Sequence, residues 1–278
     1  MTSETVVQSK PFAITLDVGT SLLNKTGSWR TERPVYLDRL PPCNHACPAG
    51  ENIQAWLGHA EEGDYEAAWR QIMEDNPLPT IMGRVCYHPC EGACNRVSLD
   101  EAVGINSVER FLGDQGIKYG WTVPVGELTG KHVMVVGSGP GGLSAAYHLR
   151  RVGHDVTIFE SSPKAGGMLR WGIPKYRLPR EKLNAEITRI EEMGVKIVLE
   201  TKVKNVQASM KEGKFDAAFL AVGAHTPKGL DIPLTGEMPV LEGITVLRDL
   251  ELDQPTGLRG HVVVYGGGNT AMDVARTA

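Results

Sequence analysis

A glycine-rich turn between an apolar strand and a helix constrains this chain more than any other feature of its sequence. Residues 132–136 read HVMVV, a short apolar run typical of a buried strand, and residues 137–142 read GSGPGG. Helical periodicity follows over 142–151, and a second apolar run, 155–159, ends at Glu160. Strand, glycine turn, helix and strand in this order predict a βαβ unit and therefore a parallel sheet.

The turn fits the pattern G-x-G-x-x-G, in which each glycine has a physical task. The first allows a tight turn, the second lets the backbone approach a pyrophosphate, and the third lets helix and strand pack closely. The free N–H groups of the helix then face the phosphates, and an acid about 20 residues on binds a ribose hydroxyl. Glu160 is the candidate for that acid. A glycine turn without a ligand is the alternative, and the order of the elements argues against it.

A second turn of this kind follows the apolar run 261–265. Residues 266–271 read GGGNTA, which fits G-x-G-x-x-A with alanine at the packing position. Two such turns predict two dinucleotides, and the natural pair is a bound flavin and a diffusing nicotinamide. A degenerate repeat without ligand is the alternative. We expect the natural protein to continue beyond Ala278, because a strand, a turn and part of a helix do not complete a dinucleotide-binding domain. Asp273 is expected on the surface of that helix.

All five cysteines lie in the first third of the chain. Cys43 and Cys47 form C-x3-C-P, and Cys86, Cys90 and Cys94 form C-x3-C-x3-C. An odd, clustered set argues against a disulfide framework and for a metal or cluster site. Proline after a cysteine occurs in ferredoxin cluster motifs, whereas zinc sites favour C-x2-C pairs. We therefore favour a [4Fe–4S] cluster, with one cysteine to spare, over structural zinc and over free core cysteines.

The rest of the chain adds helices, strands and a nearly neutral charge. Helices are expected within 50–75, at 105–112 and at 180–193, and strands at 195–199, 215–222 and 261–265. Lys and Arg number 29 against 33 Asp and Glu, so no basic excess indicates nucleic acid or an anionic membrane. We find no run of the ~18 apolar residues that a membrane span needs and no signal peptide, and expect a cytoplasmic protein.

Several longer motifs resemble one family of enzymes. They are CNHACPAGENIQ, NPLPTIMGRVCYHPCEGACNR, GSGPGGLSAAYHLR, VTIFE, AGGMLRWGIPKYRLPR, AVGAHTP and GGGNTAMDVARTA. Together they are similar to the small subunit of bacterial glutamate synthase, the N-terminal part of dihydropyrimidine dehydrogenase and the NADPH-binding subunit of electron-bifurcating transhydrogenase. The resemblance covers nearly the whole chain from about Pro41.

This resemblance implies FAD in a first Rossmann-like domain and NAD(P)H in a second domain inserted into it. The implied FAD-binding residues are Gly137, Gly139, Pro140, Gly141 and Gly142 at the pyrophosphate, Glu160 at the ribose, Gly167, Met168 and Arg177 in the segment that wraps the flavin, Val203 near the adenine, and Gly223 in a later loop. The implied residues for the nicotinamide cofactor's phosphates are Gly268, Asn269, Thr270 and Ala271.

The resemblance also implies the cluster ligands. By alignment they are Cys47, Cys86, Cys90 and Cys94. Many members of the family bind two clusters, but here Val35 and Asp38 hold two of the extra cysteine positions. Cys43 is then a remnant of the second cluster, and Glu109 stands at the position of that cluster's non-cysteine ligand.

The expected architecture is an α-helical iron–sulfur domain, an α/β Rossmann-like FAD domain and the start of an NAD(P)-binding domain. The expected bounds are 1–42 for an extended N-terminal arm, 43–125 for the iron–sulfur domain, 126–258 for the FAD-binding domain and 259–278 for the incomplete NAD(P)H-binding domain. The expected function is electron transfer between NADH or NADPH, FAD and a [4Fe–4S] cluster and a redox protein partner, in an oligomer or hetero-complex.

The arm segment TGSWRTERPVYLDRLPPCNHACP resembles flavoproteins that exchange electrons between NADH and dissimilatory sulfite reductase, which indicates a role in sulfur metabolism. A glutamate synthase large subunit is the alternative partner. A zinc-containing regulatory module that holds a dinucleotide as a structural ligand is an alternative from another class of protein.

We expect one cluster in this part of the chain. Iron and acid-labile sulfide analysis of the anaerobically purified protein should therefore give about four of each per chain. About eight irons per chain would contradict the single-cluster prediction.

Overall fold

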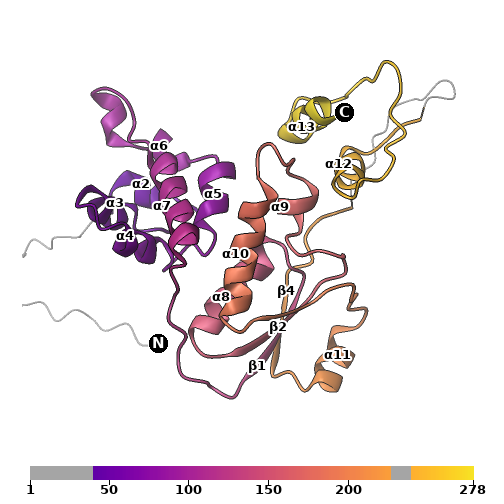
Figure 1. The fold of residues 1–278 in the computed structure, drawn as a ribbon, viewed down its shortest axis with the longest axis horizontal. Helices are drawn as coiled ribbons and strands as arrows, with labels where there is room; N and C mark the ends of the chain where they lie inside the picture. The colour runs from indigo at the N-terminus through magenta and orange to yellow at the C-terminus, as the bar shows by residue number, and fades with distance from the viewer. Residues whose placement is uncertain (1–39, 227–238) are drawn as a thin grey trace, which may run out of the picture. The chain divides into compact units, whose positions relative to one another are not determined.

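The computed structural model describes residues 40–226 and 239–278, so most of the expected arm at 1–42 lies outside the described residues. The described chain runs first through a group of helices and then through alternating strands and helices (Figure 1). Residues from Pro41 onward form one compact unit. A helical part followed by an α/β part is the order that the sequence predicts.

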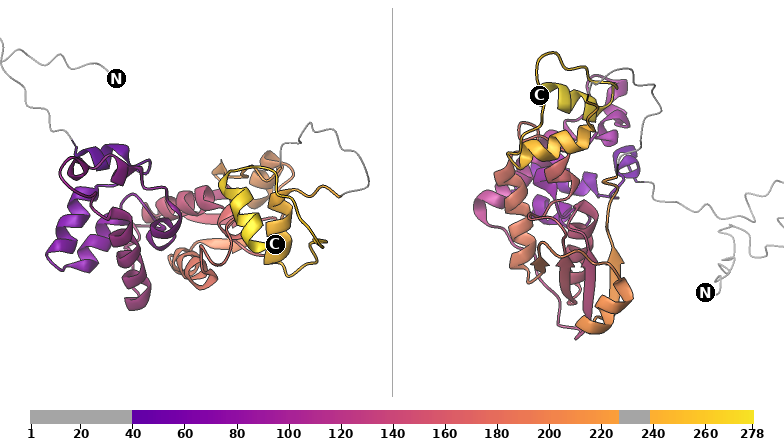
Figure 2. Two further views of the ribbon diagram at one scale, coloured as in Figure 1. Left: turned by 90° about the horizontal axis from the view of Figure 1, so that it is seen from above. Right: turned by 90° about the vertical axis from the view of Figure 1, so that its right-hand side faces the viewer.

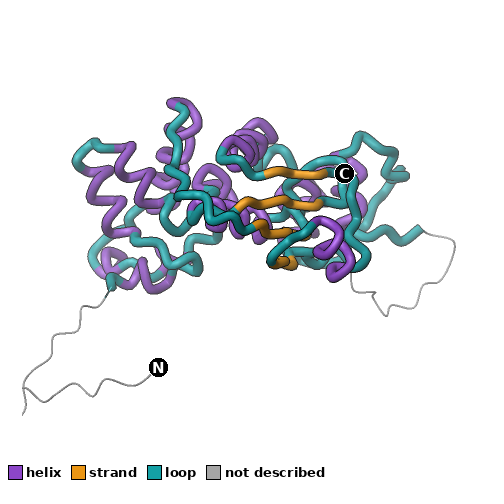
Figure 3. The backbone as a smooth tube through the Cα atoms, turned by 90° about the horizontal axis from the view of Figure 1, so that it is seen from below, coloured by secondary structure: helices purple, strands orange, loops and turns teal. Residues whose placement is uncertain are grey.

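Four parallel strands form the sheet of the α/β part (Figure 3). They are β1 His132–Val136, β2 Asp155–Phe159, β3 Lys196–Val198 and β4 Ala217–Leu220. The order is β3-β2-β1-β4, with Val135 of β1 opposite Ile158 on one side and Phe219 on the other. Because β1 has a neighbour on each side, its last four residues are buried, as its continuous apolar run predicts.

Two long helices pack on this sheet. Helix α8, Pro140–Arg151, joins β1 to β2, and helix α10, Arg180–Glu192, precedes β3. Leu143 of α8 and Leu183 of α10 lie in one hydrophobic core with residues of β1 and β2. Trp69 of the helical part belongs to the same core. The helical and α/β parts therefore stabilise each other through shared apolar burial.

The helical part consists of short helices around its own small core. They are α2 Pro42–Ala46, α3 Ile53–Glu61, α4 Tyr65–Ile72, α5 Pro79–Val85, α6 Pro89–Gly92, the 3-10 helix η2 Asn95–Ser98, and α7 Ile105–Tyr119. Asn52 and Asp64 cap α3 and α4, since each side chain accepts a hydrogen bond from a backbone N–H three residues on. The small core includes Trp56, Leu112 and Cys90.

Helix α7 is longer than the sequence predicts. The expected helix ended at Leu112, before Gly113 and Gly116, but both glycines lie inside α7. A Cβ on Gly113 would come within 2.5 Å of the backbone nitrogen of Thr80, and a Cβ on Gly116 within 2.4 Å of the Trp69 indole nitrogen. These glycines do not end the helix; they let α5 and Trp69 approach its backbone.

Four further helices complete the described chain. They are α9 Met168–Trp171, α11 Val206–Gly213, α12 Gly243–Glu251 and α13 Asn269–Thr277. Helices α12 and α13 lie side by side (Figure 2) and share a small core that contains Val246 and Val274.

The expected strand at 261–265 does not form among the described residues. A strand requires a neighbouring backbone for its hydrogen bonds, and β1 to β4 pair only with one another. Val263 is 91% exposed and Tyr265 is 74% exposed, while Val264 packs against the small core of α12 and α13. The expected strand 215–222 is also shorter, since β4 ends at Leu220.

Replacement of Gly116 by alanine should destabilise the protein by about 1–3 kcal/mol, because the added methyl group overpacks the contact between α7 and Trp69. Urea unfolding of the two proteins measures the difference.

Gly58 of α3 provides the matched control. It is also a helical glycine, but a Cβ there meets nothing within 4 Å. Gly58→Ala should stabilise the protein by about 0.5–1 kcal/mol through helix propensity. Equal effects of the two substitutions would contradict the packing explanation for Gly116.

Candidate functional site

The turn after β1 has the close backbone contacts that the glycine pattern predicts. Gly137 has φ +103°, and a Cβ there would come within 2.3 Å of the Ala221 carbonyl oxygen beyond β4. A Cβ on Gly142 would come within 1.9 Å of the Gly137 carbonyl oxygen. The first and last glycines of the turn are therefore required by the packing of turn, strand and helix.

The middle of this turn is open. Gly139 is the N-cap residue of α8, and no side chain caps that helix end. A Cβ on Gly141 would meet nothing within 4 Å, and one on Gly139 only the Gly167 Cα at 3.9 Å. Pro140 follows at the first helical position, where no N–H is needed. Open space above uncapped N–H groups at a helix start fits a pyrophosphate.

A second loop reaches the same turn. Gly167 has φ +53°, and a Cβ there would come within 2.5 Å of the Gly139 Cα. The N–H of Gly166 donates to the Ser138 carbonyl at 3.1 Å. Met168 then begins α9. The loop that the family resemblance assigns to the flavin therefore starts directly against the pyrophosphate turn.

Glu160 is buried at the end of β2 and holds this turn in place. Its carboxylate accepts hydrogen bonds from the Ser138 N–H at 2.9 Å, the Ser138 hydroxyl at 2.6 Å and the Ser162 N–H at 2.8 Å. Burial raises the pKa of Glu160, but these hydrogen bonds outweigh it and leave the pKa below its usual value. Sequence reasoning missed Ser138, because its position in the pattern accepts any residue.

The other residues assigned to FAD lie in three places. The Thr201 N–H donates to the Glu160 carbonyl at 2.8 Å, which brings the segment containing half-buried Val203 to the end of β2. Gly223, with φ +68°, follows β4, two residues beyond the Ala221 carbonyl that Gly137 approaches. Arg177 is the exception, because its guanidinium pairs with Asp273 of α13 at 2.6 Å.

Asp273 is therefore not the surface residue that the sequence predicts. It is 5% exposed and also accepts a hydrogen bond from the Tyr176 hydroxyl at 3.0 Å. No sequence signal distinguishes it, since its partners come from a segment nearly 100 residues away.

The second glycine turn repeats the conformation of the first. Gly266 has φ +129°, as Gly137 has φ +103°. Gly268 is the extended N-cap of α13, as Gly139 is of α8, and neither helix has a side-chain cap. A Cβ on Gly267 or Gly268 would meet nothing within 4 Å. Asn269, Thr270 and Ala271 form the first turn of α13, so this helix start also presents free N–H groups.

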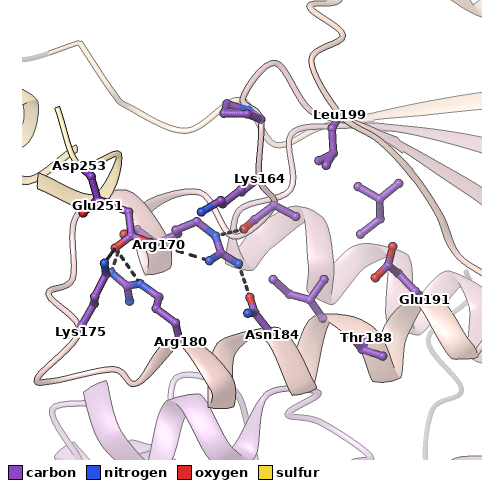
Figure 4. A pocket seen from close by; sticks show the side chains of 14 residues that line it. Lys164, Arg170, Lys175, Arg180, Asn184, Thr188, Glu191, Leu199, Glu251 and Asp253 are labelled. Carbon is purple, nitrogen blue, oxygen red and sulfur yellow. Dashed lines mark hydrogen bonds and ion pairs between the residues drawn. The ribbon is translucent and has the colours of Figure 1, made fainter. Parts of the chain in front are cut away.

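A cavity of about 630 Å³ lies between α10, β3 and the end of α12 (Figure 4). The Glu251 side chain of α12 is 5% exposed there and contacts Arg180 at 3.1 Å, Lys175 at 3.7 Å and Arg170 at 4.0 Å. Burial and the neighbouring Arg180 lower the pKa of Arg170. These ion pairs attach α12 to α9, to the start of α10 and to the segment between them. The sequence did not indicate Glu251, since its partners lie about 70 residues earlier.

The five cysteines lie at the ends of the short helices. Cys43 is in α2, Cys47 and Cys86 follow α2 and α5, Cys90 is in α6, and Cys94 precedes η2. Cys90 is close enough to Cys47 and Cys86 to interact with them electrostatically, and burial raises its pKa to about 12. Iron binding would remove this proton, because a coordinated thiol is deprotonated outright.

Backbone N–H groups surround the four sulfurs that the resemblance assigns to the cluster. Burial raises the pKa of Cys47, while N–H groups of Glu51, Ala49 and Gly50 lower it. N–H groups of Val103 and Arg96 lower the pKa of Cys94. Such concave groups of N–H donors are typical of iron–sulfur sites.

The other two sulfurs receive N–H groups as well. The Glu91 N–H points to Cys90, and the His88 N–H donates to Cys86 at 3.3 Å. His88 itself takes the left-handed conformation, with φ +43°. Cys43 differs, since its thiol donates to Asn44 at 3.7 Å.

A single zinc ion and an iron–sulfur cluster require different spacings between their sulfur ligands. Tetrahedral zinc with Zn–S bonds of about 2.3 Å needs its sulfurs roughly 3.8 Å apart. Among the described residues, no three His, Cys, Asp or Glu side chains are close enough for one metal ion. A cube of four irons binds each cysteine through a different iron, so its ligands lie further apart.

Glu109 lies in a buried group of polar side chains in the helical part. Asn76 donates to Glu109 at 2.8 Å and to Glu51 at 2.9 Å. Burial raises the pKa of Glu109 well above its usual value, and the neighbouring Glu51 raises it further. In this arrangement the Glu109 carboxyl accepts a hydrogen bond from an amide.

Comparison with known proteins assigns both parts of the chain. Residues 131–278 match the family described as pyridine nucleotide-disulphide oxidoreductase. Residues 32–121 match the family described as dihydropyrimidine dehydrogenase domain II, 4Fe-4S cluster. These matches support an iron–sulfur cluster, a flavin and a nicotinamide as cofactors and agree with the expected fold class. In the described residues, no helix is long and apolar enough to cross a membrane.

Three curated relatives illustrate the similarity. The β subunit of the NADP(+)-dependent formate dehydrogenase of Moorella thermoacetica is 41% identical, over 85% of this chain and 37% of that protein. The β subunit of the NADPH-Fe(3+) oxidoreductase of Geobacter sulfurreducens is 39% identical, over 85% and 36%. The small chain of the Bacillus subtilis glutamate synthase [NADPH] is 34% identical, over 84% and 50%. The chain thus spans between a third and a half of their lengths.

Substitution of Glu160 by glutamine should cost about 1–3 kcal/mol of stability at neutral pH, because the charged acceptor of the Ser138 and Ser162 hydrogen bonds is lost. The folded-state pKa lies below the usual value of 4.5, so this stabilisation is present above pH 4.5 and disappears as the pH falls through the folded-state pKa. The stability difference should therefore shrink in acid, as measured by unfolding between neutral pH and pH 3.

The exposed Glu212→Gln variant on α11 is the control. A Glu160→Gln deficit that stays constant down to pH 3 would show that the carboxylate charge does not stabilise the turn.

Proposed function

The chain belongs to the pyridine nucleotide-disulphide oxidoreductase family, and from this premise we propose that it carries electrons between NAD(P)H, FAD and one [4Fe–4S] cluster to a protein partner. One observation above all supports the proposal. Two glycine turns of the same backbone conformation each precede a helix whose first N–H groups have no side-chain cap. In the helical part of the same chain, backbone N–H groups point to four cysteine sulfurs.

We assign each binding site to one cofactor. The turn Gly137–Gly142, Glu160 and the loop at Gly167 and Met168 bind FAD, with Val203 and Gly223 beside it. The turn at Gly268, Asn269, Thr270 and Ala271 binds the nicotinamide cofactor. The cluster ligands are Cys47, Cys86, Cys90 and Cys94. The domain bounds proposed from the sequence, 43–125, 126–258 and 259–278, follow this assignment, with 1–42 as the arm.

The protein's own residues position these groups. When bound, the flavin exchanges a hydride with the nicotinamide and single electrons with the cluster. The α8 and α13 N-termini bind phosphates through backbone N–H groups. Glu160 fixes the pyrophosphate turn through Ser138. Arg177 joins the flavin loop to α13 through Asp273, so we place it between the two cofactors rather than on the FAD alone.

The partner is proposed as a redox subunit. Two of the relatives are β subunits and one is a small chain, which supports a hetero-complex. A dissimilatory sulfite reductase is our first candidate and a glutamate synthase large subunit the second. The arm segment that favours the first lies largely outside the described residues.

The cytoplasmic location also stays a prediction.

A visible spectrum tests the proposal against the zinc-containing module. The anaerobically purified protein should show flavin bands with a broad brown shoulder, and NAD(P)H should bleach both. A colourless protein that contains zinc would contradict electron transfer.

Two alanine substitutions test the assignment of the turns. Space for a Cβ exists at Gly139 and at Gly268, so both variants should fold. Gly139→Ala should weaken flavin binding about tenfold or more, because overpacking a close contact costs about 1–3 kcal/mol. Gly268→Ala should retain flavin but bind NAD(P)H about tenfold more weakly. Flavin content and NAD(P)H titration measure these effects, and the opposite pattern would reverse the assignment.

A further inference from the structure

Helix α5 connects the α/β part directly to a cluster cysteine. The helix starts at Pro79 and ends at Val85, and Cys86 is the next residue. On its other side α5 packs against α10 of the α/β part. Helix α10 begins directly after the loop that wraps the flavin in the proposed function. Helices α10 and α5 therefore lie between the flavin segment and one sulfur ligand.

A fully buried carboxylate fixes the first turn of α5. Glu186 of α10 accepts a hydrogen bond from the Thr80 N–H at 2.9 Å. Arg189, one turn further along α10, forms an ion pair with Glu186 and donates to the Pro77 carbonyl. The backbone before α5 and at its start is thus held by two side chains of α10, and removal of one partner of such a buried pair is costly.

A second ionic contact holds the other end of α5. Arg84, two residues before Cys86, makes hydrogen bonds of 2.8 and 3.0 Å with the Asp114 carboxylate of α7. Lys182 of α10 contacts the same carboxylate at 2.9 Å. Asp114 therefore joins α5, α7 and α10 at the end of α5 that leads to Cys86.

Helix α5 has no room to shift between these contacts. A Cβ on Gly83 would come within 2.5 Å of the Arg110 backbone, and one on Gly113 within 2.5 Å of the Thr80 nitrogen. Thr80 thus lies between the backbone of α7 and the carboxylate of Glu186. Movement of α5 away from α7 is opposed by α10, and movement away from α10 is opposed by α7.

We propose that Glu186 and Lys182 are positioning residues for electron transfer: by clamping α5 they set the place of Cys86, and with it the cluster, relative to the flavin. This inference rests on the proposed function. In the step concerned, the reduced flavin loses one electron and the oxidised cluster gains it, with any released proton passing to water. The rate of such a step falls steeply with the distance between the two centres, so a loosened α5 slows it.

The test compares four variants of the full-length holoprotein. Glu186→Ala removes the acceptor of the Thr80 N–H, and Glu186→Gln keeps a carbonyl acceptor there. Lys182→Met removes the cation next to Asp114. The Lys182 side chain is 27% exposed, and Arg84 still pairs with the Asp114 carboxylate, so the substitution leaves no buried charge unpaired. Glu181→Gln is the control, an exposed carboxylate on the same helix.

Three measurements separate the effects. Stopped-flow absorbance follows flavin reduction by NAD(P)H and then cluster bleaching. Hydrogen exchange at the Thr80 amide reports whether α5 has loosened. Glu186→Ala and Lys182→Met should slow cluster bleaching several-fold while flavin reduction is unchanged, and Glu186→Ala should exchange the Thr80 amide faster. Glu186→Gln keeps an acceptor for the Thr80 N–H but leaves the Arg189 charge without its partner, so it should restore the rate and the protection in part. Glu181→Gln should match the unmodified protein.

The failures are distinguishable. If the unmodified protein shows no flavin reduction by NAD(P)H, the proposed function is wrong. If it shows both steps but Glu186→Ala bleaches its cluster at the unmodified rate, the positioning role is wrong. Should Glu186→Ala fail to fold, Lys182→Met decides, and an unchanged bleaching rate in that variant overturns the inference.

Discussion

The close approach of backbone to backbone at the turn after β1 is the constraint on which the α/β part depends. Gly137 lies against the carbonyl of Ala221, and Gly142 lies against the carbonyl of Gly137, at distances that leave no space for a side chain. These contacts place the start of α8 at the end of β1, a central strand of the sheet. Everything that a pyrophosphate needs, an open turn and free N–H groups, follows from that placement.

The helical part uses the same principle for a different purpose. Gly113 and Gly116 let α5 and Trp69 reach the backbone of α7, and Trp69 then enters the core of the α/β part. The sequence suggested that these glycines follow the helix, because glycine lowers helix propensity. Tertiary packing outweighs that cost, since it buries the Trp69 indole and places α5, the helix that leads to Cys86.

Charged side chains join segments that are far apart in the sequence. Glu186 reaches Thr80, Glu251 reaches Arg180, and Asp273 reaches Arg177. Each of these carboxylates is almost completely buried. A buried charge is stable only with a partner, and the identity of that partner cannot be read from local periodicity. For this reason Asp273 was expected at the surface and Glu251 was not noticed.

By itself the sequence determined the order of helical and α/β parts, the bounds of β1 and β2, and the two glycine turns, because apolar periodicity and glycine conformation are local properties. It did not determine the length of α7 or the absence of a strand at 261–265. Those depend on which backbone lies alongside, which only the tertiary structure decides. The same holds for the cysteines: their spacing indicates a cluster, but the N–H groups that point to Cys47 and Cys94 come from how the chain folds around each sulfur.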